Sequence, residues 1–141
     1  MDFLIKKYFG FLSERFSFKG PFLYNYSRES YTDFVNGQIV VSIGFDGDYW
    51  VNIYKTKKLF PELQTGEMRI IDIDFKNKIG LAFYKLDKNK KIWNSVSNDN
   101  FPDKKLWYYN KLISLNPEVL DGNFEKTKLI YSLRNLFKKK K

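Results

Sequence analysis

Apolar residues recur every three or four positions through the first sixteen residues of the chain, with polar residues between them. The apolar positions are Leu4, Tyr8, Phe11, Leu12 and Phe16. This spacing places them on one side of a helix and predicts an amphipathic helix over residues 2–16. Lys19-Gly20-Pro21 ends that pattern and starts an extended segment over residues 22–28.

The middle of the chain changes to strict alternation, which is typical of half-buried β-strands. Asn36-Gly37 and Asp46-Gly47 interrupt the alternation with dipeptides that suit tight hairpin turns. They predict antiparallel strands at 31–35, 38–45 and 48–56, and alternation places a further strand at 68–75. One face of this meander is expected to carry Ile39, Val41, Ile43, Phe45, Tyr49, Val51 and Ile53. The opposite face is expected to carry Val40, Ser42, Trp50, Asn52 and Tyr54, with Asp72 and Asp74 if the later strand joins the sheet.

The last third returns to helical spacing. Pro102 and Asp103 suit the start of a helix, which runs to Asn116-Pro117, and a last helix is expected over 124–138. Residues 57–66 and 95–100 are connections, and the pattern at 79–95 fits either strand or helix. The chain is therefore predicted to be one α+β domain over 1–141. It combines an N-terminal helix, an antiparallel meander of four to five strands, and C-terminal helices packed on one sheet face.

Composition narrows the chemistry that the chain can perform. Its 141 residues include no histidine and no cysteine. Disulfides, thiolate catalysis, histidine general bases and histidine-bound zinc are therefore excluded. No segment has the roughly 18 consecutive apolar residues of a membrane span, and the N-terminus does not read as a signal peptide. We expect a cytoplasmic protein without cofactor, structural metal or membrane partner.

The formal net charge of +9 is concentrated near the C-terminus. Residues 101–141 carry ten basic and four acidic side chains, and four of the ten form the terminal run Lys138 to Lys141. A basic tail suits nucleic acid or an acidic protein surface. A solubilising, disordered end explains the run better and is the interpretation favoured here.

One short motif suggests catalysis. Asp72-Ile73-Asp74-Phe75-Lys76 resembles the metal-binding acid and nearby lysine of PD-(D/E)xK nucleases, whose Mg²⁺ ion needs only oxygen ligands. Such an enzyme also needs an acid on the preceding strand, but Asp46 and Asp48 lie at a turn, where aspartate is common for other reasons. The motif therefore leaves a Mg-dependent nuclease as the least favoured hypothesis.

Two groups of aromatic residues are candidates for binding. Trp50, Tyr54, Tyr24 and Tyr26 accompany Lys55, Lys57 and Lys58, a combination that stacks bases in single-strand binders. Burial beneath helices explains these rings more simply, with Gly44 leaving room for Trp50 to lie flat. Leu106-Trp107-Tyr108-Tyr109 has more aromatic side chains than one buried helical stripe holds, so Trp107 or Tyr108 is expected to face sideways or outward. Exposed aromatics of this kind often anchor protein interfaces.

The layout as a whole resembles small bacterial immunity proteins of polymorphic and contact-dependent toxin systems. The resemblance rests on the opening helix, the hairpin Val41-Ser42-Ile43-Gly44-Phe45-Asp46, and Leu106 to Ile113 leading into Asn116 to Phe124. It implies a non-enzymatic inhibitor that binds a cognate toxin. Many such proteins are acidic, so a basic chain implies a toxin with an acidic face or contact through the less charged sheet. A nucleic-acid-binding or phage-encoded regulatory protein is the alternative.

The expected partner-binding residues are Trp50, Asn52, Tyr54, Lys55, Asp72, Asp74, Trp107 and Tyr108. No catalytic residue is assigned. Trp50 and Tyr54 are expected to act as anchors on a rigid sheet, each contributing about 2 kcal/mol to binding.

Overall fold

The structure, a computed structural model, describes residues 2–56, 69, 78–96, 103–125 and 127–130. Helices α1, α2, α4 and α5 comprise Phe3–Phe9, Phe11–Phe16, Lys91–Asn94 and Asp103–Leu115. Strands β1 to β6 comprise Lys19–Asn25, Ser30–Asn36, Ile39–Phe45, Tyr49–Thr56, Lys78–Leu81 and Lys128–Ile130. Short 3₁₀ helices η2, η3 and η5 comprise Phe83–Lys85, Lys88–Lys90 and Pro117–Asp121.

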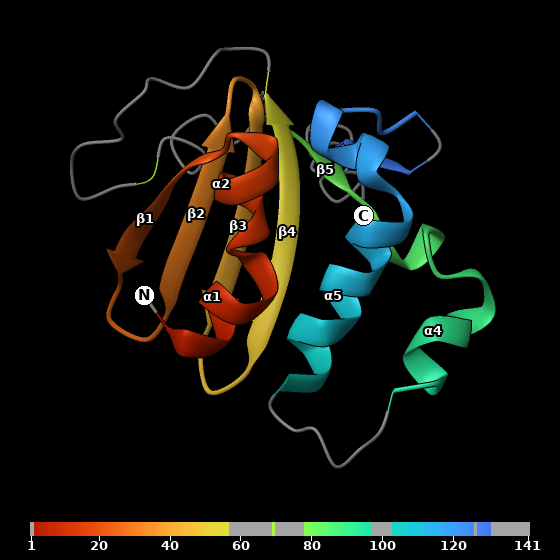
Figure 1. Ribbon diagram of the computed structural model, residues 1–141, viewed down its shortest axis with the longest axis horizontal. Helices are drawn as coiled ribbons and strands as arrows, with labels where there is room; N and C mark the ends of the chain where they lie inside the picture. The colour runs from red at the N-terminus through yellow and green to blue at the C-terminus, as the bar shows by residue number, and fades with distance from the viewer. Residues whose placement is uncertain (1, 57–68, 70–77, 97–102, 126, 131–141) are drawn as a thin grey trace, which may run out of the picture.

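The described strands form one antiparallel sheet in the order β1-β2-β3-β4-β5-β6, so every strand pairs with its neighbours along the chain (Figure 1). The two predicted hairpin turns join β2 to β3 and β3 to β4. Gly37 and Gly47 have φ values of 59° and 75°, a region that glycine adopts without steric cost. The three strands predicted around these turns are confirmed as β2, β3 and β4, and the pairing of β3 with β4 places Val41 opposite Ile53 and Gly44 opposite Trp50.

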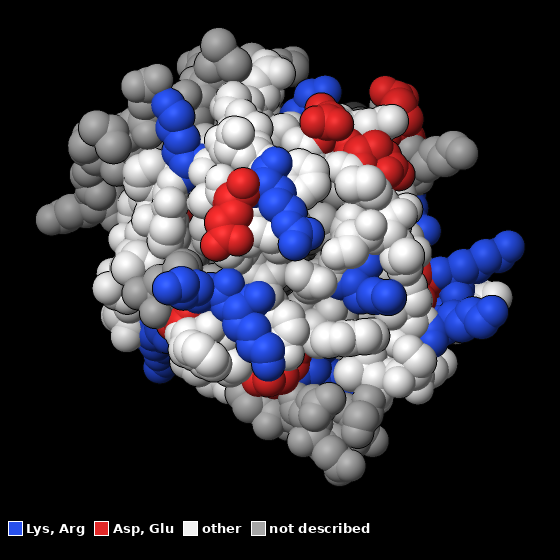
Figure 2. Space-filling model, viewed as in Figure 1, with Lys and Arg blue, Asp and Glu red and all other residues white. Residues whose placement is uncertain are grey.

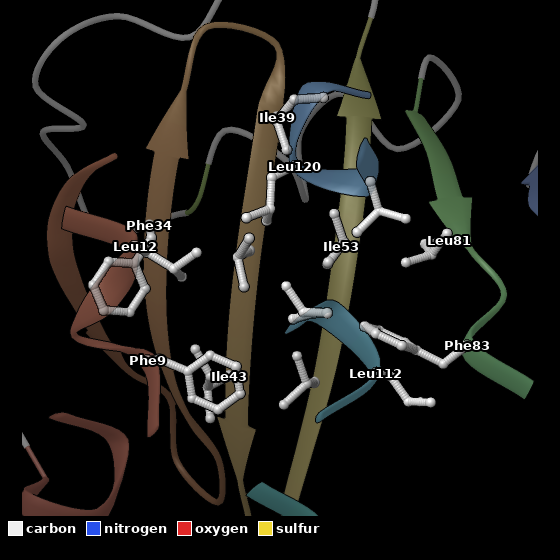
Figure 3. Close-up of a cluster of buried hydrophobic side chains, with 14 of the residues drawn as sticks. Phe9, Leu12, Phe34, Ile39, Ile43, Ile53, Leu81, Phe83, Leu112 and Leu120 are labelled. Carbon is white, nitrogen blue, oxygen red and sulfur yellow. The ribbon is translucent and has the colours of Figure 1, made fainter. Parts of the chain in front are cut away.

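Helices α1, α2 and α5 lie together on one face of the sheet (Figure 1). The core fills the space between these helices and the strands, where Phe9, Leu12, Ile43, Ile53 and Leu112 meet (Figure 3). The predicted inward row is buried at Ile39, Val41 and Ile43. Phe45 differs: it is 38% exposed at the end of β3, where its ring lies beside Tyr49. The α+β class with helices on one sheet face is confirmed.

The predicted N-terminal helix has the expected extent but divides at Gly10 into α1 and α2. The Gly10 amide donates to the carbonyl of Lys6 at 3.0 Å, so the backbone continues across the junction. A Cβ atom at this position would lie 2.7 Å from the Lys6 carbonyl oxygen. Glycine therefore allows the two helices to meet closely.

The predicted last helix over 124–138 is wrong where the structure describes it. Residues 128–130 form β6, and Ile130 pairs with Ile79 of β5. The apolar spacing of residues 124–138 fits a helix. It contains no information about β5, whose outer backbone N–H and C=O groups need a strand to pair with. The undecided segment 79–95 contains β5, η2, η3 and α4. Of the strand expected at 68–75 only Arg69 is described, and it belongs to no strand.

Among the described residues, no helix combines the length and apolar character needed to cross a bilayer.

Candidate functional site

Trp93 of helix α4 packs against helix α5. The ring of Trp93 meets that of Tyr108 edge-on, with centroids 4.9 Å apart. The ammonium of Lys104, one turn before Tyr108, lies 4.4 Å from the centroid of the Trp93 ring. Lys104 and Tyr108 share a face of α5 because residues four apart are helical neighbours. The indole therefore rests on a paired cation and ring rather than on aliphatic core.

Asp87 fixes the loop that precedes α4. Its carboxylate accepts hydrogen bonds from the backbone N–H groups of Ile92 and Trp93 at 2.8 and 3.1 Å. It also accepts one from the Tyr108 hydroxyl at 2.8 Å. A helix start leaves N–H groups without intrahelical partners, and a carboxylate satisfies them well. Asp87 thus joins the start of α4 to the middle of α5.

These contacts also set the protonation states. Asp87 is only 3% exposed, and burial by itself opposes its ionisation. The hydrogen bonds from Ile92, Tyr108 and Trp93 outweigh burial and lower the Asp87 pKa. Burial and the bond to Asp87 raise the pKa of Tyr108. At neutral pH the pair is therefore a carboxylate accepting from a protonated phenol.

The loop between Asp87 and α4 has an unusual backbone. Asn89 and Lys90 are consecutive non-glycine residues with φ values of 60° and 54°. This left-handed region costs roughly 1–2 kcal/mol per residue for most side chains, although asparagine tolerates it better. The tight loop brings Lys90 to the wall of a pocket.

That pocket has a volume of about 290 Å³ and opens beside α5. Its walls combine aromatic rings with two lysines and one carboxylate, from Tyr84, Asp87, Lys90, Trp93, Lys105, Tyr108 and Tyr109. Tyr109 is supported from behind by Phe83, with ring centroids 4.8 Å apart. Tyr84 is 70% exposed at the mouth of the pocket. The inner rings are held in place, while the outer ring presents apolar surface to solvent.

The two lysines of the pocket differ in their partners. The Lys105 ammonium lies 2.6 Å from a carboxylate oxygen of Asp48. The hydrogen bond from Lys105 lowers the pKa of Asp48, so this pair is ionised at neutral pH. No carboxylate among the described residues pairs with Lys90. Within the described part of the chain, Lys90 is therefore the pocket lysine that remains available to an acidic ligand.

Of the predicted binding residues that the structure describes, one lies in this pocket. Tyr108 lines it, whereas Trp107 is half-buried on α5 and does not. Tyr84, Asp87, Lys90 and Trp93 were missed because 79–95 had no assigned structure. One signal in the sequence could have indicated them. The segment contains several large aromatic residues, but their spacing fits neither the buried face of a helix nor that of a strand.

Trp50, Asn52 and Tyr54 lie on the sheet face away from the helices, and all three are half-buried. The Trp50 indole lies directly against Gly44, as expected from the sequence. The contact is so close that a Cβ atom at position 44 would overlap the indole. It also meets Tyr31 edge-on at 5.9 Å. Tyr54 packs against buried Val35 and Val40.

Arg69 fills the middle of the same face. Its guanidinium donates to both carboxylate oxygens of Asp33, at 2.7 and 3.0 Å, and to the Ser42 hydroxyl at 2.8 Å. It also lies 4.0 Å from the centroid of the Tyr31 ring. This face therefore has a buried polar centre rather than an open apolar one.

Of the remaining predicted residues, Lys55 is described and the others are not. Lys55 extends to the helix side, where its ammonium donates to the carbonyl of Gly122 at 3.4 Å. It thus lies on the other face from Trp50 and Tyr54. Asp72, Asp74 and Lys76 fall outside the described residues, as do Lys57 and Lys58. Within the described ranges, histidine, cysteine, aspartate and glutamate form no group of three that would hold a metal ion.

Comparisons with known proteins found no matching family model, curated protein or solved structure.

Proposed function

We propose that this chain is a non-enzymatic protein-binding module of the immunity type, which neutralises a cognate toxin in the bacterial cytoplasm by occluding its surface. The pocket beside α5 is its binding site. The observation that carries the proposal is Tyr84, a tyrosine 70% exposed beside a pocket lined by three further aromatic rings. Exposed tyrosine and tryptophan next to a pocket are typical anchors of protein interfaces.

The rigidity of the pocket supports this function. Asp87 holds both α4 and Tyr108, and Phe83 supports Tyr109. A surface already fixed in its bound shape loses less conformational entropy on association, so more of its contact free energy appears as affinity. The costly backbone at Asn89 and Lys90 is consistent with a loop shaped for binding.

Charge supports a partner with an acidic face. The chain has a net charge of +9, and lysines line the pocket at positions 90 and 105. Lysines around an apolar site accelerate encounter with an acidic surface more than they tighten the complex. In many immunity proteins an acidic inhibitor binds a basic toxin. Here a basic inhibitor would bind an acidic toxin surface.

Growth rescue tests the proposal. The protein encoded beside this chain's gene is produced in a host with and without the chain, and its purified form is used for affinity measurements. We expect the chain to restore growth, and Tyr84→Ser to weaken the complex by about 2 kcal/mol. Phe3→Ser is the matched control, because Phe3 is 76% exposed but does not line the pocket. Equal effects of the two substitutions, or an absence of rescue, would refute the proposal.

Nucleic-acid binding is the second candidate, since rings interleaved with lysines also stack bases. On the face that carries the helices, basic side chains are scattered among acidic ones (Figure 2). A phosphate backbone is better matched by a continuous basic stripe. This view therefore favours a protein partner.

A further inference from the structure

We infer that the pocket beside α5 receives one aromatic side chain from an acidic segment of the partner, with a neighbouring carboxylate on Lys90. This inference rests on the proposed protein-binding function and specifies the partner's chemistry. Three features of the pocket carry it: its volume, the arrangement of its rings and the distribution of its charges.

The volume selects a single ring. At about 290 Å³ the pocket is slightly smaller than the roughly 300–1,000 Å³ typical of small-molecule sites. A dinucleotide or another cofactor of several rings exceeds this space. One phenylalanine, tyrosine or tryptophan side chain fits it, while the segment carrying that side chain stays on the surface beside Tyr84.

The rings of the pocket already form an edge-to-face series. Trp93 meets Tyr108 at 71°, and Phe83 meets Tyr109 at 67°. Tyr108 and Tyr109 adjoin each other with centroids 5.3 Å apart. Aromatic pairs prefer such tilted geometries, which contribute about 0.5–1.5 kcal/mol beyond the area they bury. An entering ring extends this series, whereas an aliphatic side chain gains only burial.

The charges select an acidic neighbour for that ring. Lys90 and Lys105 line the pocket, and a third ammonium, that of Lys104, lies against Trp93. Asp87, the only carboxylate among the described lining residues, already accepts three hydrogen bonds and is buried. Among the described lining residues, a cationic ligand would therefore find no carboxylate free to pair with it, and it would lie beside the Lys90 ammonium. A carboxylate beside the ring instead pairs with Lys90, which lacks a carboxylate partner among the described residues.

Short blocked peptides test this inference on the isotope-labelled full chain by nuclear magnetic resonance. The probe is a pentapeptide with phenylalanine between aspartate and glutamate. One comparison peptide has alanine in place of phenylalanine, and a second has lysines in place of the acids. A thymidine oligonucleotide represents nucleic acid. The signals followed are the Trp93 indole N–H and the backbone amides of Tyr84 and Lys90.

We expect the acidic aromatic peptide to shift these signals with a millimolar dissociation constant. The alanine and lysine peptides should bind at least about tenfold more weakly. Lys90→Glu should abolish the preference for acids while leaving the Trp93 signal of the free protein in place. Tighter binding of the oligonucleotide at the same signals would overturn the inference, as would indifference to peptide charge or no shift with any probe.

The growth assay separates this inference from the proposed function. If Tyr84→Ser abolishes rescue but the acidic aromatic peptide does not bind, the protein-binding function stands and the assigned occupant is wrong. If the peptide binds as expected but Tyr84→Ser leaves rescue and affinity intact, the pocket's specificity stands and its role in toxin binding is wrong.

Discussion

Arg69 and Asp33 form a buried, two-pronged ion pair, although they lie 36 positions apart in the sequence. Two guanidinium nitrogens donate to the two carboxylate oxygens at 2.7 and 3.0 Å, and both side chains are almost fully buried. The Ser42 hydroxyl accepts a further hydrogen bond from Arg69. This pair ties a residue outside the strands to the centre of β2 and β3 on the face away from the helices.

Removing one partner of this pair should be costly. Arg69→Met leaves the Asp33 carboxylate buried without its counter-charge, and we expect it to lower the free energy of unfolding by about 3–5 kcal/mol. The double variant Arg69→Met/Asp33→Leu should recover much of that loss, because a buried pair is often replaceable by apolar side chains. Urea unfolding at neutral pH measures both. A loss below about 1 kcal/mol for Arg69→Met would show that the pair does not hold this face together.

Gly44 and Trp50 give a second test of the same face. A Cβ atom at Gly44 would overlap the Trp50 indole, so Gly44→Ala should cost about 1–3 kcal/mol of stability. In a Trp50→Leu background the same substitution should cost at least about 1 kcal/mol less, because the two sites are in direct contact. Thermal or urea unfolding of the four proteins in this cycle provides the measurement. Additive effects would contradict the close packing.

How far the sequence predicted these features depends on the range of the contacts involved. Asn36-Gly37 and Asp46-Gly47 define their turns locally, and alternation around Val41 and Ile53 defines the strands between them, so the meander was predictable. The room for Trp50 above Gly44 followed from that register. In contrast, β6 depends on pairing with β5, and no pattern within residues 124–138 contains that information.

The candidate site was less predictable for the same reason. Tyr108 was predicted to face sideways or outward, because its helix has more aromatic residues than one buried face can hold. Its partner Asp87 lies 21 positions earlier, in a loop whose left-handed turn at Asn89 and Lys90 has no glycine to signal it. Arg69 likewise gave no indication that its partner was Asp33. Long-range polar contacts leave little trace in local apolar spacing.

The lowered pKa of Asp87 predicts acid sensitivity of the loop before α4. A carboxylate whose folded-state pKa is depressed contributes stability that is complete above its unfolded pKa, about 3.9, and is lost as pH falls through the folded value. We expect Asp87→Asn to cost roughly 2 kcal/mol at neutral pH and progressively less below about pH 4. Urea unfolding across this pH range gives the measurement, with Tyr108→Phe as a milder control that removes one hydrogen bond. A constant cost at every pH would argue against an ionised Asp87.

Absence of nuclease activity is a separate expectation. The motif Asp72-Ile73-Asp74-Phe75-Lys76 lies outside the described residues, so its test is chemical. Purified chain is incubated with plasmid DNA and with RNA in magnesium or manganese, and we expect both substrates to stay intact. Cleavage that disappears with both Asp74→Ala and Lys76→Ala would instead establish a metal-dependent nuclease.

The two aromatic surfaces of the chain should differ in what they stabilise. Trp50 lies against Gly44 and Tyr31, and Tyr54 against Val35 and Val40, so each ring is part of the packing of the sheet. We therefore expect Trp50→Ala and Tyr54→Ala to lower the free energy of unfolding by about 2 kcal/mol, less than full burial of such rings would give. Tyr84 has most of its surface in solvent, so Tyr84→Ala should leave unfolding nearly unchanged and weaken partner binding.

Paired measurements on the same three variants decide between the surfaces. Thermal unfolding reports the contribution of each ring to the fold, and calorimetric titration with the purified product of the neighbouring gene reports its contribution to the proposed interface. Measuring both quantities on every variant separates a loss of folding stability from a loss of contact with the partner. If Trp50→Ala and Tyr54→Ala each weaken the complex by about 2 kcal/mol with unchanged unfolding, while Tyr84→Ala has no effect, the sheet face is the interface. The pocket beside α5 would then have to be abandoned as the binding site, and the acidic aromatic occupant with it.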